Sequence, residues 1–468
     1  MKISSIIDVL DNDENIINQE LGGMLIWPIV RYVIIQHFID KSNQLNTPKS
    51  ISSPVSTGEK IFGAIKAIIK CPYFGPKKPV LIFNTAASSI KRSNGSYFNR
   101  ITGYFYDVSP KDTWIIEDPI GFWHPSPNVQ MAYSKLTFNV FSEFIARFIL
   151  VFVRKHRDTA QNAMSLLFNN INRNMIKLNF QIEDEILKKK LIKSVLRMKP
   201  NYWLYRMLFR FKKINAIIIE DGYYGLEKAI IIKAAKDLGV RVIEPQHGFI
   251  NENHPSYNYG EKILQSITYK LYMPDVLLCY GDFWANGIQI PNKKYILGNP
   301  HLEESLKYLK NTEELKKILV LGSGITIEET NSLLSTLLLF NSRGYEVVYR
   351  PHPQEKFDVS LRYGTQINNG VKIDDKDLYL SMAESDIIIG ELSTTIFEAI
   401  ALQKKIFLYN SSYTQAYFNE RIKYFKIISL KDVSTIFDPY IVDKGSYNYY
   451  WKKDWQDSYL EFRKLFNL

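Results

Sequence analysis

Two adjacent carboxylates follow a short run of isoleucines near the middle of the chain. Residues 217–219 are all isoleucine, and Glu220, Asp221 and Gly222 come directly after them. Neighbouring carboxylates repel each other, which tends to raise the pKa of one member of the pair. A carboxyl group whose pKa approaches neutrality is suited to general base catalysis. Residues of this kind also cap helices, so the pair has to be weighed together with the other motifs.

A histidine between two prolines ends another apolar run. In "VVYRPHP" (347–353), Arg350 precedes Pro351, His352 and Pro353. Proline fixes its own backbone and restricts the residue before it, so His352 is held in a rigid turn. A histidine in such a turn can donate a hydrogen bond to a phosphate or act as an acid. We therefore expect Arg350, His352 and Pro353 to lie in a binding or catalytic site.

Small and hydroxyl-bearing residues stand where two predicted strands meet the next helix. The turn in "KILVLGSGIT" (317–326) contains Gly322, Ser323 and Gly324, and the turn in "GELSTTIFE" (390–398) contains Ser393, Thr394 and Thr395. Backbone N–H groups at a helix N-terminus favour an anion, so both turns are candidate phosphate sites. A tight turn or a helix cap would use the same residue types. Glu398 lies one helical turn further on, where it could reach a sugar hydroxyl.

A polar and aromatic loop follows a third predicted strand. The stretch "VIEPQHGFINENHPSYNYG" (242–260) contains Gln246, His247 and Gly248 where the strand ends. Because this loop follows a strand of the same sheet as residues 216–220, we expect it to face the same site. His247 is then either a catalytic group or a buried structural histidine.

The elements that must position these motifs are strands buried on both faces. Continuous Ile, Val and Leu runs bounded by turn residues are typical of such strands. From residue 215 onward these runs alternate with helical patterns, which indicates parallel strands in doubly wound sheets. Ligands of such sheets bind beyond the carboxyl ends of the strands. We therefore expect an α/β fold with two Rossmann-like units facing a cleft and a helical N-terminal extension.

The strand pattern restarts near residue 316, so we place a domain boundary at 305–315. This divides the chain into units at 1–310 and 311–445, followed by a terminal helix at 446–468 that crosses back to the first unit. Within the first unit the sequence predicts a helix over 13–41, a loop over 42–58, a helix over 59–74 and mostly helices over 137–212.

Composition narrows the classes of partner and compartment. The formal net charge is +11, which suits an anionic substrate or an anionic surface. No compact Lys/Arg block or nucleic-acid-binding motif is present, so we expect no nucleic-acid partner. The two cysteines, Cys71 and Cys279, are far apart in the sequence, which favours a reducing compartment, and we expect a cytoplasmic protein.

Two apolar stretches, 22–39 and 138–156, are interrupted by charged residues. A membrane span needs about 20 mostly apolar residues, so both stretches are better explained as amphipathic helices. The second ends in a basic run that would suit peripheral contact with the anionic inner face of a cell membrane.

Taken together, the motifs resemble those of a known family. The two facing units look like a GT-B glycosyltransferase, and the order acid–acid–Gly, His–Pro, Ser/Thr pair resembles bacterial sialyltransferases and polysialyltransferases. The motifs stand here as Glu220-Asp221-Gly222, His352-Pro353 and Ser393-Thr394-Thr395. "PQHG" (245–248) and "YILGNP" (295–300) are also similar to stretches of capsule and surface-polysaccharide transferases.

The resemblance implies an inverting glycosyltransferase that moves a CMP-activated nonulosonic acid onto a bacterial capsule or lipopolysaccharide glycan. Glu220 would be the base, with Asp221 second, while His352, Ser393 and Thr394 would hold the donor phosphate. Residues 1–310 would bind the acceptor, either free or lipid-linked, and residues 311–445 the nucleotide sugar. No Asp-x-Asp motif follows a predicted strand, so we expect no catalytic metal and no cofactor beyond the donor.

Three alternatives stay open. "RPHP" followed by a Ser/Thr pair also resembles the CDP-glycerol and ribitol-phosphate transferases of teichoic-acid synthesis, and His247 would match their base. A non-catalytic GT-B-like module that binds glycans or scaffolds their assembly would need no base. A nucleotide-sugar epimerase of the same fold is disfavoured by the long N-terminal part of the chain.

Overall fold

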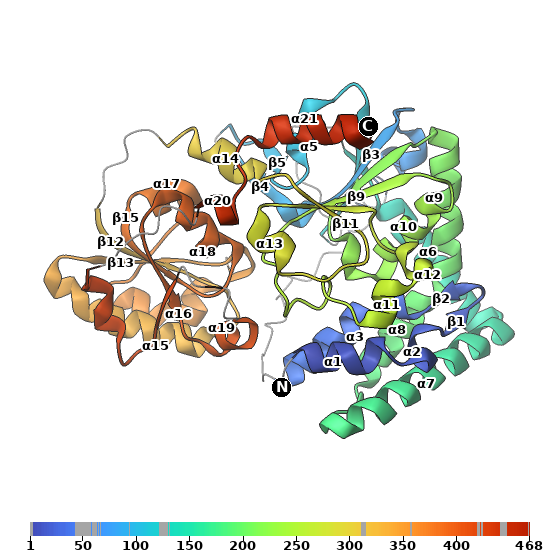
Figure 1. The fold of residues 1–468 in the computed structure, drawn as a ribbon, viewed down its shortest axis with the longest axis horizontal. Coiled ribbons are helices and arrows are strands. Elements are labelled where there is room, and N and C mark those ends of the chain that lie inside the picture. Colours follow the sequence, from blue (N-terminus) through green and yellow to red (C-terminus); the bar gives the residue numbers. More distant parts are fainter. Residues whose placement is uncertain are drawn as a thin grey trace.

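The structure is a computed structural model that describes residues 3–42, 67–92, 94–120, 132–309, 315–355, 358–418, 425–439 and 447–466, with isolated residues between these ranges. Two parallel sheets lie side by side, each covered by helices (Figure 1). The loop predicted at 42–58 and the start of the helix predicted at 59–74 lie outside the described residues, apart from isolated positions.

The first sheet has seven strands in the order β11-β10-β9-β8-β3-β6-β7, all parallel. The direction of winding reverses between β3 and β8, which are neighbours in the sheet although far apart in sequence. The strands are β3 (Val80–Thr85), β6 (Thr113–Asp118), β7 (Ala132–Ser134), β8 (Ala216–Ile219), β9 (Arg241–Pro245), β10 (Val276–Cys279) and β11 (Lys293–Ile296).

The second sheet has six parallel strands in the order β14-β13-β12-β15-β16-β17. Both sheets therefore have the strand order of a Rossmann fold, and the winding of the second reverses between β12 and β15. The prediction of two Rossmann-like units in a GT-B arrangement is confirmed. The strands are β12 (Leu315–Leu321), β13 (Glu346–Arg350), β14 (Lys372–Ile373), β15 (Ser385–Gly390), β16 (Lys405–Tyr409) and β17 (Lys426–Ile428).

Helices cover both faces of each sheet. In the N-terminal half they are α1 (Ile3–Asp11), α2 (Glu14–Ile17), α3 (Trp27–Ser42), α5 (Gly103–Val108), α6 (Leu136–Phe152), α7 (Arg154–Met175), α8 (Glu185–Leu196), α9 (Met198–Lys212), α10 (Leu226–Lys236), α11 (Glu261–Gln265), α12 (Ile267–Lys270) and α13 (Asp282–Asn286). The connection to the second sheet begins with α14 (Pro300–Leu306). Beyond it are α15 (Ile327–Leu337), α16 (Val359–Asn368), α17 (Leu378–Ala383), α18 (Thr394–Glu398), α19 (Ser412–Tyr417), α20 (Tyr447–Tyr450) and α21 (Trp455–Phe466).

Two short hairpins differ from the sequence-based prediction. The single helix predicted over 13–41 is interrupted by β1 (Glu20–Leu21) and β2 (Met24–Leu25), because Gly22 and Gly23 both take positive φ angles that turn the chain back. The polar segment after β3, for which the sequence predicts no strand, contains β4 (Ser89–Lys91) paired with β5 (Tyr97–Asn99).

The mostly helical segment predicted over 137–212 forms helices α6 to α9. Within the described part of the chain, no single helix is long and apolar enough to cross a membrane. Only α6 together with residues Arg154–Leu178 meets the length and composition criteria for a span, and that pair is bent by 100°.

A buried ion pair fixes the N-terminal extension to the first sheet. Arg31 of α3 and Asp11 of α1 are 3% and 0% exposed, and their side chains lie 2.7 Å apart. Arg31 also donates to the carbonyl of Asn258 (2.7 Å) and stacks over Tyr259. The extension therefore helps to hold the loop that follows β9.

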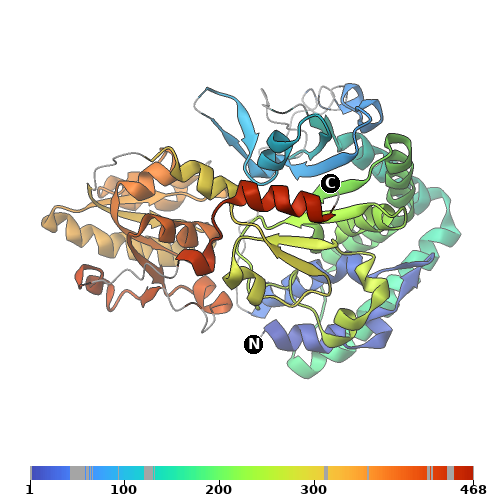
Figure 2. The same cartoon turned by 45° about the horizontal axis from the view of Figure 1, so that its top comes forward.

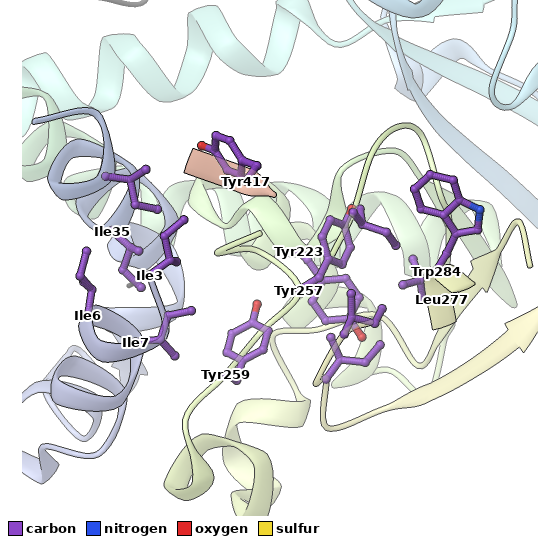
Figure 3. Close-up of a cluster of buried hydrophobic side chains, with 14 of the residues drawn as sticks. Ile3, Ile6, Ile7, Ile35, Tyr223, Tyr257, Tyr259, Leu277, Trp284 and Tyr417 are labelled. Carbon is purple, nitrogen blue, oxygen red and sulfur yellow. The ribbon is translucent and has the colours of Figure 1, made fainter. Parts of the chain in front are cut away.

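Around this ion pair, one apolar cluster joins the extension, the first sheet and the second half of the chain. Figure 3 shows Ile3, Ile6 and Ile7 beside Ile35, with Tyr259 and Tyr417 across from them. Tyr417 belongs to α19 in the second half, and its carbonyl accepts a hydrogen bond from Asn251 (2.7 Å). The two halves are therefore packed together through a shared core.

The C-terminal helix α21 returns to the first sheet (Figure 2). Trp455, Tyr459 and Phe462 pack in one buried cluster with Phe105 of α5 and Leu278 of β10. The opposite face of the sheet is covered by residues of α6, α9 and α10, which form a separate cluster.

Removing one partner of the Asp11–Arg31 pair leaves the other charge buried without compensation. We expect Asp11→Asn to lower the free energy of unfolding by about 3–5 kcal/mol, measured by chemical denaturation. The matched control is Lys262→Ala, which breaks the exposed Lys262–Glu14 pair (2.7 Å) and should cost about 1 kcal/mol or less. Equal losses in the two variants would contradict the structural role assigned to the buried pair.

Candidate active site

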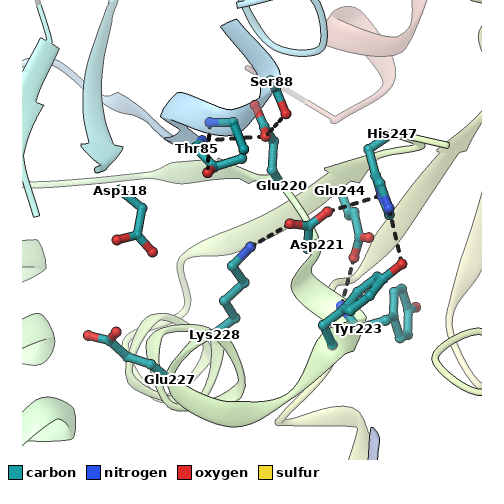
Figure 4. Close-up of polar contacts among 12 residues, drawn as sticks. Thr85, Ser88, Asp118, Glu220, Asp221, Tyr223, Glu227, Lys228, Glu244 and His247 are labelled. Atoms are coloured by element: carbon teal, nitrogen blue, oxygen red, sulfur yellow. Dashed lines mark hydrogen bonds and ion pairs between the residues drawn. The ribbon is translucent and has the colours of Figure 1, made fainter. Parts of the chain in front are cut away.

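The first winding reversal places Glu220 and Asp221 at the carboxyl end of β8, beside the end of β3. Asp221 has a φ of 54°, which is uncommon for a residue with a side chain. The next residue must be glycine, since a Cβ at Gly222 would lie 2.8 Å from both the Glu244 carboxylate and Pro274. The sharp turn therefore directs the two adjacent acids into different surroundings (Figure 4).

Glu220 is buried beneath the segment that follows β3. The Ser88 hydroxyl donates to its Oε2 (2.8 Å), and the backbone N–H of Thr85 lies 3.4 Å from the same oxygen (Figure 4). Burial, together with the negative charge of Asp221, raises the pKa of Glu220 to about 7. The carboxyl group thus titrates where a general base is most effective, but only 1% of the residue surface is exposed.

Asp221 lies in a more polar setting and is partly exposed. Its carboxylate is 2.8 Å from Lys228 Nζ and 3.2 Å from His247 Nδ1. Burial would raise the pKa of this group, but His247 and Lys228 outweigh it and lower the pKa to about 2. Asp221 is therefore ionised at neutral pH, and it is better suited to orienting His247 than to accepting a proton.

The histidines beside Asp221 belong to one chain of polar contacts whose direction can be assigned. Burial lowers the pKa of His254 to about 3, so its ring is neutral, and the Ser256 N–H donates to its Nδ1 (3.2 Å). His254 Nε2–H then donates to the Tyr224 oxygen (3.1 Å), and the Tyr224 O–H donates to His247 Nε2 (3.2 Å). Burial also lowers the pKa of His247, which leaves its single proton on Nδ1 facing Asp221.

The same region contains a third carboxyl group, that of Glu244 on β9. It accepts hydrogen bonds from the Tyr257 hydroxyl (2.6 Å) and the Tyr223 N–H (2.9 Å), and it is fully buried. Burial raises the pKa of Glu244 to about 8. No sequence motif had singled out this residue, because an acid within an apolar strand gives no sign of its partners.

Gln246, predicted as a binding residue, shapes the loop that carries His247. Its side chain donates to the Gly248 carbonyl (2.8 Å) and accepts from the Tyr280 N–H (3.0 Å). The loop is thereby tied to β10.

In the second half, a buried glutamate organises the His–Pro turn. Glu355 accepts hydrogen bonds from the backbone N–H of His352 (2.8 Å) and from the hydroxyls of Tyr349 and Tyr363. A Cβ at Gly322 would lie 2.9 Å from its carboxylate.

Gly324, with a φ of 73°, leaves equally little room, because a Cβ there would lie 2.9 Å from Glu355 Cγ. The loop that contains Ser323 is therefore packed directly on the His–Pro turn, and its glycines are required by this contact. Pro353 is exposed where this turn ends.

The hydroxyl-bearing turn meets the histidine loop of the other half. Ser393 caps α18 by accepting from the Ile396 N–H (3.4 Å), and Thr394 and Thr395 begin the helix. The Thr394 hydroxyl lies 3.5 Å from the position of a Cβ on Gly248. Thus Gly248 of the first half and Thr394 of the second, both predicted as binding residues, come together across the boundary between the sheets.

The side chains of Glu398 and Arg350 form hydrogen bonds with other side chains of the protein. Glu398 is 3% exposed and accepts from the Asn299 side chain (3.1 Å), which links the two halves. Arg350 donates to Asp374 (2.6 Å) and to the Lys376 carbonyl, beside β14. The Arg350 side chain is therefore held beside β14.

Arg100 is a functional candidate that the sequence had not indicated. It follows β5 and lines a small pocket together with Gln246, Tyr280 and Asn299. Burial raises the pKa of Glu398 and lowers that of His352, and the charge of Arg100 lowers both. Among the described residues, no carboxylate lies within ion-pair distance of this guanidinium.

One sequence signal could have revealed where Arg100 lies. Asn94-Gly95 is a strong hairpin signal, and it predicts that the chain returns toward the end of β3. Within the described ranges, no three His, Cys, Asp or Glu side chains are grouped so that they could hold a metal ion.

No protein-family model matches the chain, and no curated protein matches it. Similar solved structures include a UDP-GlcNAc 2-epimerase from Methanocaldococcus jannaschii, with 10% identity, a TM-score of 0.46 and coverage of 83% of this chain and 99% of that one. An α,α-trehalose-phosphate synthase from Burkholderia xenovorans (10% identity, TM-score 0.39) covers 83% of this chain and 100% of its own. A glycosyltransferase from Rickettsia africae (12% identity, TM-score 0.40) covers 83% and 99%.

The raised pKa of Glu244 makes stability depend on pH. Its folded pKa of about 8 exceeds the ordinary value of 4.5, so the stabilisation is complete below pH 4.5 and is lost as pH rises through 8. Glu244→Gln, which mimics the neutral form, should therefore raise the melting temperature relative to wild type at pH 9 but not at pH 4, by roughly a few degrees. Differential scanning calorimetry across this range is the measurement.

The control for this experiment is Glu185→Gln, whose carboxylate is 67% exposed. Its difference from wild type should be the same at both pH values. A Glu244→Gln curve parallel to the wild-type curve would show that the carboxyl group is not held neutral by the fold.

Proposed function

We propose that this protein is an inverting glycosyltransferase that moves a sugar from a nucleotide donor to an acceptor hydroxyl. The observation that carries the proposal is the meeting of loops at the carboxyl ends of strands from both sheets. The loops after β8 and β9 of the first sheet carry Asp221 and His247, and α18 of the second presents Thr394 against Gly248. Ligands of open parallel sheets bind at such points, so a donor and an acceptor would meet there.

On the donor side, the candidate phosphate ligands are the Thr394 and Thr395 hydroxyls and His352. Burial lowers the pKa of His352, so its ring is neutral and can serve as a hydrogen-bond donor. In the reaction, the acceptor oxygen forms a bond to the anomeric carbon while the bond from that carbon to the donor phosphate breaks. Negative charge then grows on the phosphate, and donors already positioned there stabilise it.

On the acceptor side, two groups are candidates for the base that removes the hydroxyl proton. Glu220 has a pKa near 7, which suits proton transfer at neutral pH, but it is buried beneath Ser88. His247 is neutral and is oriented by the ionised Asp221, and moving the Tyr224 hydroxyl away would free its Nε2 to accept a proton. We assign the base to Glu220, with His247 as the alternative.

The finer proposal is that the donor is a CMP-activated nonulosonic acid and the acceptor a bacterial surface glycan. Such a sugar carries a carboxylate on its anomeric carbon. Arg100 supports this assignment, since its guanidinium lines the pocket at the carboxyl ends of the strands and acts electrostatically on both halves. A planar guanidinium matches a carboxylate with two parallel hydrogen bonds.

A second candidate is transfer of glycerol or ribitol phosphate from a CDP-linked donor. The contact between Asp221 and His247 favours it, because an acid that orients a neutral histidine is a recurring arrangement for proton abstraction.

The donor can be identified by mixing the protein and a glycan acceptor pool with CMP-, CDP- or UDP-linked donors and measuring nucleotide release. We expect release of CMP from a CMP-nonulosonic acid. Turnover of UDP-sugars alone would overturn the finer proposal while leaving glycosyl transfer standing. Nucleotide binding by calorimetry without any turnover would instead indicate a binding module.

The base can be assigned with Glu220→Gln and His247→Ala, each measured for kcat with the preferred donor. If Glu220 is the base, Glu220→Gln should lower kcat by about 10²–10⁴-fold, and wild-type kcat/KM should rise with pH through about 7 as the carboxyl group loses its proton. The matched control is Glu328→Gln, an exposed glutamate on α15 that should keep full activity. If His247→Ala loses activity while Glu220→Gln keeps it, the result would support the second candidate, transfer of glycerol or ribitol phosphate.

A further inference from the structure

Helix α6 exposes an almost entirely apolar face. The exposed apolar side chains on it are between 48% and 72% accessible, and they are Val140, Phe141, Phe144, Phe148, Val151 and Phe152. Their spacing places them on one side of the helix, where Arg147 is the only other exposed residue. Soluble monomers rarely leave so many large apolar side chains together in water.

Two neighbouring segments extend this surface. On α9, Trp203, Met207 and Phe211 recur every four residues and are each more than half exposed. The segment before β3 adds Ile68, Ile69 and Phe74, which are at least 62% exposed. We call these two sets of exposed side chains, together with those of α6, the apolar face.

Hydrogen bonds and helix packing show that the three segments are adjacent. The Thr137 hydroxyl of α6 donates to the Ala67 carbonyl (2.8 Å), and the Tyr73 hydroxyl donates to the Leu204 carbonyl of α9 (3.0 Å). Helices α6 and α9 also pack on each other. Both lie at the end of the molecule away from the second sheet, which therefore does not cover them (Figure 1).

The rim of the apolar face is basic. The exposed cations on the same segments and at their ends are Lys77, Arg154, Lys155, Arg210 and Lys213, and Arg147 lies within the face. The nearby acids are already engaged, since Glu143 contacts Arg147, Lys193 and Arg197, and Asp158 contacts Arg154 and Arg157. The apolar face therefore carries an excess of positive charge.

We propose that the apolar face docks this protein onto an anionic lipid bilayer, with α6 and α9 lying in the plane of the headgroups. Apolar residues on one side of a helix and cations at its edges are the features that hold a helix at a membrane interface. Trp203 adds the residue type most favoured at that depth. A second copy of the same face would bring like charges together, so charge complementarity selects the lipid.

The position of α6 links the bilayer to the site. Lys135, directly before α6, pairs with Asp118 at the end of β6 (2.7 Å) and with Glu227 of α10 (2.8 Å). The following residue, Lys228, holds Asp221. The apolar face thus begins at the same edge of the sheet as the candidate active site. The docking inference rests on the surface alone and does not depend on the proposed function.

The test is flotation of the full chain with phosphatidylcholine vesicles, with or without phosphatidylglycerol. Wild type should float with the anionic vesicles, less so as salt is raised. Phe144→Glu combined with Phe148→Glu should weaken binding about tenfold or more, because two apolar anchors become charged. The matched control is Leu339→Glu combined with Leu361→Glu, two residues of the second half that are 71% and 83% exposed, and it should bind like wild type.

Two further measurements test whether misfolding or dimerisation explains the result. Circular dichroism should give the same spectrum and melting temperature for both double variants, since none of the four side chains is buried. Size-exclusion chromatography with light scattering, without vesicles, tests the competing occupant. A wild-type dimer that becomes monomeric in the Phe144→Glu, Phe148→Glu variant would overturn the proposal, as would wild type that stays unbound to anionic vesicles.

Discussion

The first half of the site depends on the contacts that the Asp221 carboxylate makes with Lys228 and His247. It is held between Lys228 and His247 at a backbone position with positive φ, so its place is fixed by the turn as well as by charge. Its negative charge helps to raise the pKa of Glu220, and it fixes the proton of His247 on Nδ1. The different behaviour of two adjacent acids thus follows from one being paired and the other being buried without a cation.

The sequence predicts the fold and the strand ends well, because buried parallel strands leave continuous apolar runs. Since such strands end at one edge of their sheet, Asp221 and His247 could be expected near each other. Arg100 was not singled out, because its place depends on the β4–β5 hairpin, whose one sign in the sequence is Asn94-Gly95. The burial of Glu220 was equally hidden, since it is set by Ser88, which lies more than a hundred residues away in sequence.

The residue type of Gly322 and Gly324 is compatible with two structural roles. Gly322 and Gly324 match a turn that admits an anion, and the structure shows that they also admit the side chain of Glu355. Both roles require the absence of a Cβ, so the pattern cannot separate them. Arg350 is a second example. It lies two residues before His352 in the sequence, but in the folded chain its side chain pairs with Asp374.

The chain passes between the two sheets twice, once after α14 and once before α21, and the second passage is held tightly. The Trp451 indole donates to the Phe397 carbonyl of the second half (3.1 Å), and the next residue, Lys452, donates its backbone N–H to Tyr280 of the first (2.8 Å). Separating the two halves would leave these crossings in place, but it would break the non-covalent contacts between the halves, including the hydrogen bond from Asn251 to Tyr417.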